Sequence, residues 1–226
     1  MKRKKKLQRK IVWVLVADLI FLGCLFLRLQ KSESQPAQMV TPRRKVALTF
    51  DDGPSPIWTE ALLEGLKQRG VKATFFLMGK NVEKYPELVK QIQQEGHLIG
   101  NHGYSHTQLT AISEERALEE IKKTNEAIYN CIGSYPEFMR PPYGSIQKDM
   151  EKKTDMMVVL WDVDPTDWCR SSTVGITKSV VAKVQDHSII LLHDQYESSV
   201  KAALQIVDTL MNEGYEFVTV DEILLD

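Results

Sequence analysis

Two adjacent carboxylates end a short apolar run in this 226-residue chain, and they are the first residues whose types could do chemistry. Residues 46–48 (Val-Ala-Leu) predict a buried strand, and Asp51 and Asp52 come at its end, before a turn at Gly53-Pro54. Side chains alternate along an extended backbone, so the two carboxylates should point in different directions. One could bind a metal ion while the other faces a reacting water. An acidic turn without function would look the same, so the later motifs decide.

Two histidines four residues apart form the second motif. His102 and His106 are two of only five histidines in the chain. At this spacing both imidazoles lie on one side of a helical turn and can bind one metal ion. Such a pair is often structural, but an aspartate from another strand end would complete a set of two nitrogens and one oxygen. This set suits Zn²⁺, Co²⁺ or another first-row ion and leaves positions open for water and substrate.

Three further polar stretches follow predicted strands. Two prolines after Arg140 fix the turn there, so a backbone N–H beyond them could bind a substrate oxygen. A loop with Asp164 and Asp167 follows the next strand, and His193 ends an apolar strand. Taken singly, such an arginine is typical of a surface or packing residue, and such a histidine of a hydrogen-bonded core residue.

These motifs need elements that position them, and apolar runs alternate with amphipathic segments from residue 45 onward. The runs predict seven strands, at residues 46–50, 73–78, 98–101, 137–139, 156–161, 188–192 and 216–220. Apolar residues at helical spacing predict helices at residues 60–69, 87–95, 113–129 and 198–211. Strands and helices in alternation predict a parallel sheet of the α/β class.

Both a barrel and an open doubly wound sheet fit this alternation. The candidate residues follow five different strands, whereas an open sheet usually binds its ligand around one switch point. We therefore predict a distorted (β/α)7 TIM-like barrel with the site at the carboxyl ends of its strands. Seven strands rather than eight should leave the closure of this barrel imperfect.

The five motifs, in this order and at these spacings, resemble those of the polysaccharide deacetylase family (carbohydrate esterase family 4, with the NodB homology domain). The stretches that carry the resemblance are Thr49-Phe50-Asp51-Asp52-Gly53-Pro54, His102-Gly103-Tyr104-Ser105-His106, Arg140-Pro141-Pro142-Tyr143-Gly144, Trp161-Asp162-Val163-Asp164-Pro165-Thr166-Asp167-Trp168 and Leu191-Leu192-His193-Asp194. The resemblance covers about residues 45–226 and implies a distorted (β/α) barrel, in agreement with the number of predicted strands.

The resemblance implies a role for each motif residue on the metal side of the site. Asp52, His102 and His106 correspond to the metal ligands of the family. Asp51 corresponds to the general base, and Arg140 would pair with Asp51 and orient it. We expect the bound ion to be Zn²⁺, with Co²⁺ or another first-row ion as alternatives.

The resemblance also implies residues that bind the substrate and protonate the leaving group. His193 corresponds to the general acid, with Asp167 as its partner. The backbone N–H of Tyr143 would help to hold the oxyanion. Leu191 and Trp168 would line the pocket for the acetyl methyl group.

The activity implied by this resemblance is hydrolysis of a linear amide, in which N-acetyl groups are removed from a polysaccharide and acetate is released. Peptidoglycan GlcNAc or MurNAc, or chitin-like oligomers, are the expected substrates. Two alternatives stay open: an O-deacetylase of acetylated xylan-like glycan, and a catalytically silent glycan-binding or sporulation-type scaffold. We expect a monomer.

The charge of the chain is divided unevenly. Residues 1–45 contain 12 basic and 2 acidic residues, and the rest of the chain contains 17 basic and 28 acidic residues. A strongly acidic body argues against nucleic acid as a partner.

An apolar segment at residues 11–29 follows the basic segment at residues 1–10. Only Asp18 and Arg28 interrupt it. We expect a single transmembrane helix with the basic end in the cytoplasm and the body outside, since basic residues stay on the cytoplasmic side. The alternative is a cleaved signal peptide and secretion. Residues 30–44 are expected to be a linker, and residues 45–226 the polysaccharide deacetylase domain.

The resemblance assigns no role to several residues near the motifs, and a role of Cys169 as a fourth metal ligand stays open. Cys131 and Cys169 are predicted at opposite ends of the barrel, which argues against a disulfide bond between them. His97 and His187 precede strands and are expected to be structural. Gly103 stands where the family often has Ser or Thr, which puts the rigidity of this loop in question.

Overall fold

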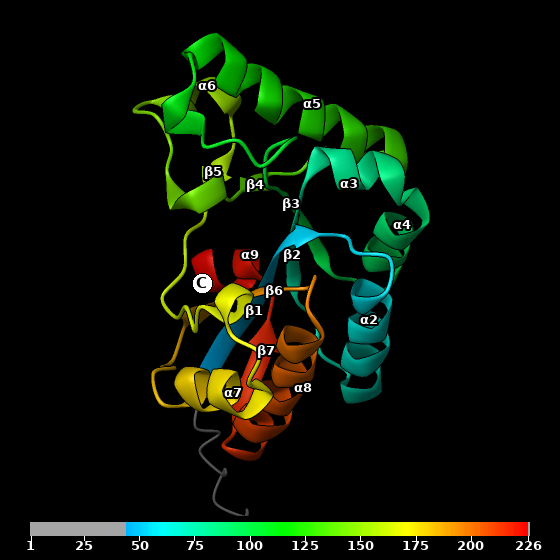
Figure 1. Cartoon of the computed structure of the whole chain (residues 1–226), viewed down its shortest axis with the longest axis vertical. Helices are drawn as coiled ribbons and strands as arrows, with labels where there is room; N and C mark the ends of the chain where they lie inside the picture. Colours follow the sequence, from blue (N-terminus) through cyan, green and yellow to red (C-terminus); the bar gives the residue numbers. More distant parts are fainter. Residues whose placement is uncertain (1–43, 226) are drawn as a thin grey trace, which may run out of the picture. The chain divides into compact units, whose positions relative to one another are not determined.

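The computed structural model of the protein describes residues 44–225 (Figure 1). The expected basic segment at residues 1–10, the apolar segment at residues 11–29 and almost all of the expected linker lie outside the described residues. Within residues 44–225, no helix combines the length and the apolar character needed to cross a membrane.

All seven predicted strands are present. They are β1 (Arg44–Gly53), β2 (Thr74–Leu77), β3 (Leu98–Asn101), β4 (Phe138–Met139), β5 (Met157–Val158), β6 (Ser188–His193) and β7 (Tyr215–Val218). The pairings between these strands are parallel. The predicted parallel α/β class is therefore confirmed.

Helices connect and cover these strands. They are α2 (Trp58–Arg69), α3 (Gly79–Lys84), α4 (Pro86–Gln94), α5 (Glu114–Ile132), α6 (Met150–Thr154), α7 (Thr173–Val181), α8 (Glu197–Asn212) and α9 (Val220–Leu224), with 3₁₀ turns η1 (Leu109–Ala111), η2 (Pro142–Gly144) and η3 (Asp167–Cys169). The predicted helices correspond to α2, α4, α5 and α8. The sequence did not predict α3, α6 and α9, because five or six residues are too few to show a helical period. It also missed α7, whose nine residues are rich in Val, Ile and Thr.

The last predicted strand is shorter than expected at its carboxyl end. Val220 was predicted to end this strand but is the first residue of α9. Thr219 caps this helix in a capping box with Glu222, so the backbone turns into a helix there.

β1 lies at the centre of the sheet. Thr49, Phe50 and Asp51 pair with both β2 and β6, whereas Val46 and Ala47 pair with both β7 and β6. Since a strand has only two edges, β6 takes one edge of β1, and β7 and β2 share the other. The strand order is β5-β4-β3-β2-β1-β6, and β7 lies outside this path.

The two ends of this path approach each other through one bridge. Beyond β5 the chain continues to Val163, which pairs with Ile190 of β6. The predicted strand at 156–161 is a strand only at Met157–Val158. The chain pairs with β4 there, and its bridge to β6 comes beyond the predicted strand, at Val163. The arrangement thus differs from the predicted barrel in two ways. β7 pairs with β1 instead of taking a place in the strand order, and the sheet is closed only by the isolated bridge between Val163 and Ile190.

The two faces of β1 pack against different side chains. Residues 46, 48 and 50 belong to a core cluster with apolar residues of α2 and α8. Ala47 belongs to a second cluster with Phe76 of β2, Phe138 of β4 and Ile189 of β6. By strand alternation, Asp51 points to the same face as Ala47, away from α2 and α8.

Candidate metal centre and active site

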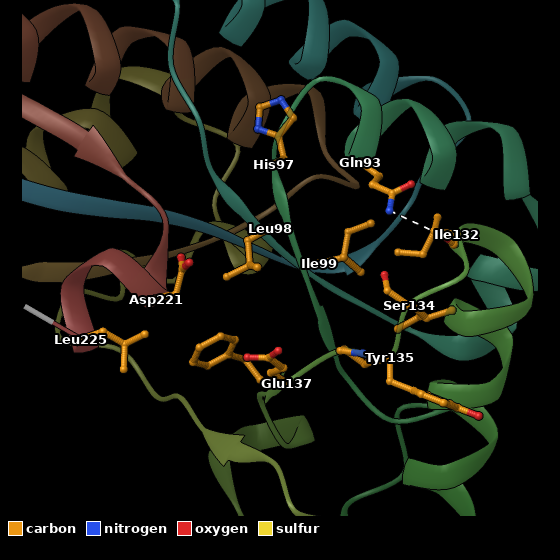
Figure 2. A pocket seen from close by; sticks show the side chains of 13 residues that line it. Gln93, His97, Leu98, Ile99, Ile132, Ser134, Tyr135, Glu137, Asp221 and Leu225 are labelled. Carbon is orange, nitrogen blue, oxygen red and sulfur yellow. Dashed lines mark hydrogen bonds between the residues drawn. The ribbon is translucent and has the colours of Figure 1, made fainter.

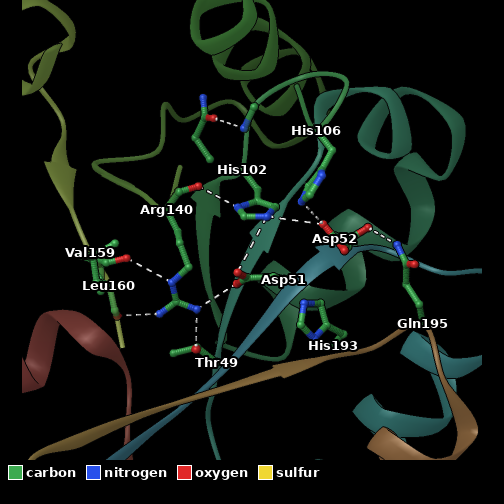
Figure 3. A network of polar contacts seen from close by, with 12 residues as sticks. Thr49, Asp51, Asp52, His102, His106, Arg140, Val159, Leu160, His193 and Gln195 are labelled. Carbon is green, nitrogen blue, oxygen red and sulfur yellow. Dashed lines mark hydrogen bonds and ion pairs between the residues drawn. The ribbon is translucent and has the colours of Figure 1, made fainter. Parts of the chain in front are cut away.

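A β-bulge re-aims the side chain of Asp52. The register between β1 and β2 shifts between Asp51 and Gly53, so Asp52 has no partner in β2, and its φ is 72°. Strand alternation would turn its side chain toward the helix-covered face, but a bulge rotates the extra residue. The prediction that the two carboxylates diverge is wrong, because Asp51 Oδ2 lies 3.7 Å and Asp52 Oδ1 3.4 Å from the same nitrogen, His102 Nε2 (Figure 3).

Asp52, His102 and His106 form a cluster that fits a metal ion. Asp52 Oδ1 lies 3.4 Å from His102 Nε2 and 3.2 Å from His106 Nε2. The Oδ1 atom is buried and accepts no hydrogen bond. A buried carboxylate oxygen without a donor is costly, and a cation between the three side chains would compensate it. One oxygen and two nitrogens are also donor atoms that suit Zn²⁺ and other first-row divalent ions such as Co²⁺.

The electrostatic environment differs among the three side chains of this cluster. Burial opposes the charge of His102, but Asp51 and Asp52 outweigh it and raise the pKa of this imidazole. His102 Nδ1 lies 2.6 Å from the carbonyl oxygen of Arg140, so an Nδ1–H donor leaves Nε2 as the free acceptor. Burial lowers the pKa of His106 and favours its neutral, ligating form. Burial opposes the charge of Asp52, but His102 and His106 outweigh it and lower the pKa of this carboxyl.

The loop between the two histidines is held by side chains that the sequence analysis did not single out. Asn101 Oδ1 accepts the N–H of Gly103 at 2.7 Å, and Glu120 Oε2 accepts the N–H groups of Tyr104 and Ser105 at 3.0 and 2.8 Å. Gly103 has φ = +70°, a conformation that favours glycine. Glycine at this position therefore suits a loop that Asn101 of β3 and Glu120 of α5 hold in place.

Arg140 is fully buried and holds Asp51. Its Nη1 donates to Asp51 Oδ1 at 2.8 Å and to Thr49 Oγ1 at 2.7 Å, while Nε and Nη2 donate to the carbonyl oxygens of Val159 and Leu160, both at 3.0 Å. Asp51 is thereby fixed with Oδ2 turned toward the cluster of Asp52, His102 and His106 (Figure 3). The predicted pairing of Arg140 with Asp51 is present in the structure.

His193 stands beside Asp51 on the neighbouring strand, as its partner in the β1–β6 register. Its Nδ1 lies 2.8 Å from Asp167 Oδ1, and its backbone N–H donates to Asp167 Oδ2 at 2.8 Å. Burial opposes the charge of His193, but Asp167 outweighs it and raises the pKa of the imidazole to about 9. A histidine with this pKa is protonated at neutral pH and can donate a proton.

The remaining predicted site residues differ in exposure. Tyr143 is 64% exposed, has φ = 61°, and its ring centroid lies 4.7 Å from that of His106. Trp168 is 56% exposed in η3, directly after Asp167, and Leu191 is buried in β6. Asp164, in contrast, caps its own loop by accepting the N–H of Thr166.

The residues expected to be structural lie away from this cluster. His97 is buried, accepts the N–H of Ala73 through Nδ1, and has a pKa lowered to about 4 by burial. It lines a cavity of about 370 Å³ at the amino ends of β3 and β4 (Figure 2). The candidate site lies at the other end of the sheet, where β1 and β6 end at Gly53 and His193. Cys131 and Cys169 are free thiols whose Sγ atoms donate to the carbonyl oxygens of Pro86 and Thr166, so no disulfide joins them.

Comparison with known proteins identifies the family of this chain. The family model described as polysaccharide deacetylase matches residues 38–159. The peptidoglycan-N-acetylglucosamine deacetylase PgdA of Listeria monocytogenes is 39% identical over 180 residues, which cover 80% of this chain and 39% of that protein. A peptidoglycan-N-acetylglucosamine deacetylase of Bacillus cereus is 35% identical over 209 residues, which cover 87% of this chain and 98% of that protein.

The chain belongs to the polysaccharide deacetylase family. Its described fold agrees with solved structures of the family: the peptidoglycan deacetylase PdaC of Bacillus subtilis superposes with a TM-score of 0.79 at 40% identity, covering 81% of this chain and 91% of that one. The chain spans about two fifths of the full length of PgdA and of PdaC.

The family motifs contain the residues that line the site. They do not include most of the residues that hydrogen-bond to those motif residues and hold them in place. Asn81, Asn101, Glu120 and Gln195 each hydrogen-bond a motif residue or its loop. Thr49 is the first residue of the first motif, was assigned no role, and accepts a hydrogen bond from Arg140. Thr49 could have been found from the strand period, since it shares a face with Asp51. The other four have no pattern in the sequence, because they reach the site from separate elements.

Proposed function

We propose that this protein removes N-acetyl groups from cell-wall polysaccharide and releases acetate and a free amine. The observation that carries the proposal is the position of Asp51 and His193, a carboxylate and a protonated imidazole, on adjacent strands beside the cluster of Asp52, His102 and His106. Peptidoglycan GlcNAc or MurNAc are the proposed substrates, because relatives are named as deacetylases of these sugars.

The proposed cofactor is a divalent ion, Zn²⁺ or alternatively Co²⁺, held by Asp52, His102 and His106. Such an ion polarises the acetyl carbonyl and makes a water molecule more acidic. Asp51 takes a proton from the attacking water, and Arg140 keeps this carboxylate in position. The backbone N–H of Tyr143 stabilises the oxyanion that forms on the carbonyl.

His193 completes the reaction in this proposal. As the C–N bond breaks, the imidazole gives its proton to the leaving nitrogen, and Asp167 stabilises the charged form beforehand. Leu191, two residues before His193, and Trp168, directly after Asp167, are proposed to contact the acetyl methyl group.

We also propose that residues 11–29 anchor the protein in the cell membrane, with the catalytic domain outside the cytoplasm. The run of basic residues before this apolar segment supports that orientation. A location outside the cytoplasm would place the site next to the cell wall.

Acetate release from N-acetylglucosamine oligomers tests the proposed function. We expect release by the purified protein, loss of release after treatment with a chelator, and recovery on addition of Zn²⁺ or Co²⁺. Asp51→Asn should lower the rate about 10²- to 10⁴-fold, the range for a lost general base, while metal binding is retained. Release that is insensitive to the chelator, or glycan binding without turnover at any metal loading, would overturn the proposal.

A further inference from the structure

The bulge at Asp52 leaves a backbone carbonyl outside the β1 ladder. The extra residue has no partner in β2, and its positive φ is a conformation that is unfavourable for a non-glycine residue. Such a conformation persists only where neighbouring groups fix it. The contacts of the Asp52 backbone should therefore decide where its carboxylate lies.

Two side-chain amides bind this carbonyl oxygen. Asn81 Nδ2 donates to it at 2.8 Å from α3. Gln195 Nε2 donates to it at 3.0 Å from the turn after β6, and Figure 3 shows this second bond. A carbonyl oxygen has two lone pairs, so these two donors satisfy it. The turn that carries Gln195 is itself packed against the bulge, since a Cβ added to Gly53 would lie 2.5 Å from Asp194 Oδ2.

We propose that Asn81 and Gln195 are positioning residues that preorganise the metal site through the backbone of Asp52. The inference rests on the proposed metal centre. By fixing the carbonyl, the two amides hold Asp52 in its left-handed conformation and keep Oδ1 between the imidazoles of His102 and His106. Without them the peptide can relax toward the extended ladder, which turns the carboxylate to the helix-covered face. Metal binding would then have to restore the bulge.

The affinity for Zn²⁺ measures this effect directly. We expect Asn81→Leu and Gln195→Met, which keep side-chain bulk and lose the amide, each to weaken Zn²⁺ binding about 10- to 100-fold, the range for partners behind a metal ligand. A fluorescent zinc indicator in competition with the full-length protein gives the dissociation constant. Excess Zn²⁺ should restore most of the acetate release of Asn81→Leu.

Gln68→Met is the matched control. Gln68 lies exposed on α2 and hydrogen-bonds Glu64, so its replacement should leave the Zn²⁺ affinity unchanged. Thermal unfolding of the metal-free variants shows whether they fold. If Asn81→Leu or Gln195→Met does not fold, Asn81→Asp and Gln195→Glu decide, because they keep the shape and replace the donor with an oxygen.

The outcomes separate this inference from the proposed function. Wild-type protein that binds no Zn²⁺ would overturn the metal centre itself. Wild-type protein that binds Zn²⁺, together with folded variants whose affinity stays within twofold, would overturn only the positioning role of the two amides.

Discussion

Asp51 and Asp52 are neighbours in the sequence, but their carboxylates have different electrostatic environments. Asp51 is buried against a fully buried arginine, with hydrogen bonds that hold both charges in place. Asp52 Oδ1 is buried without a donor and faces two imidazoles. The first carboxylate is thus neutralised within the protein, and the second is left for a cation.

Removal of one partner of the buried Arg140–Asp51 pair should strongly destabilise the folded protein. We expect Arg140→Met to lower the free energy of unfolding by roughly 3–5 kcal/mol, because Asp51 is then left as an uncompensated buried charge. Urea denaturation measures this change. Arg69→Met is the control: Arg69 pairs with Asp208 at 2.7 Å on the surface, and loss of that pair should cost about 1 kcal/mol or less. Equal losses in the two variants would contradict the assignment.

At the scale of elements, the site is built where strand ends meet loops from elsewhere in the chain. β6 ends at His193, and the loop after β5 brings Asp167 in η3 against both the imidazole and the backbone N–H of that residue. The same loop reaches β6 through the bridge at Val163. The bridge between Val163 and β6 therefore closes the path of strands and also helps to position Asp167, the partner of the proposed acid His193.

The pKa of His193 should depend on this loop. In metal-free protein the imidazole should titrate near pH 9 by NMR, and Asp167→Asn should lower that midpoint. Since the pKa is raised from about 6.5 in the unfolded chain, protonation stabilises the fold fully below about pH 6.5. This contribution disappears as the pH rises through about 9.

Activity should follow the same titration. The alkaline limb of acetate release should move to lower pH in Asp167→Asn, because the proposed acid loses its proton earlier. Asp164→Asn is the control, since this carboxylate of the same loop accepts the N–H of Thr166. An unchanged NMR midpoint in Asp167→Asn would contradict the pairing as the cause of the raised pKa.

At the scale of the whole molecule, the described sheet has two unlike ends. The carboxyl ends of the strands carry the candidate metal centre, and the amino ends of β3 and β4 border the cavity beside His97 (Figure 2). The candidate catalytic and metal-binding side chains lie together because the strands are parallel, so that all their carboxyl ends are at the same end of the sheet.

The proposed membrane anchor makes a prediction for the intact protein in cells. Deletion of residues 2–29 should move the protein from the membrane fraction to the soluble fraction of a producing cell, because the apolar segment is lost. The purified shortened protein should keep its acetate release. Immunoblots of the two fractions measure the change, and full-length protein in the soluble fraction would contradict the anchor.

The amino-acid sequence by itself determined the residue types of the site, the seven strands and the parallel class of the sheet. These follow from local signals: apolar runs, helical spacing, and polar motifs directly after strands. Short motifs in a fixed order also sufficed for the resemblance to the family.

Only the tertiary structure decided how these residues meet. Strand alternation predicted that Asp51 and Asp52 diverge, and the bulge reversed this because Asn81, Gln195 and the turn at Asp194 fix the backbone of Asp52. The place of β7 beside β1 was likewise set by pairing across the chain. Such contacts join residues far apart in sequence, and no local period records them.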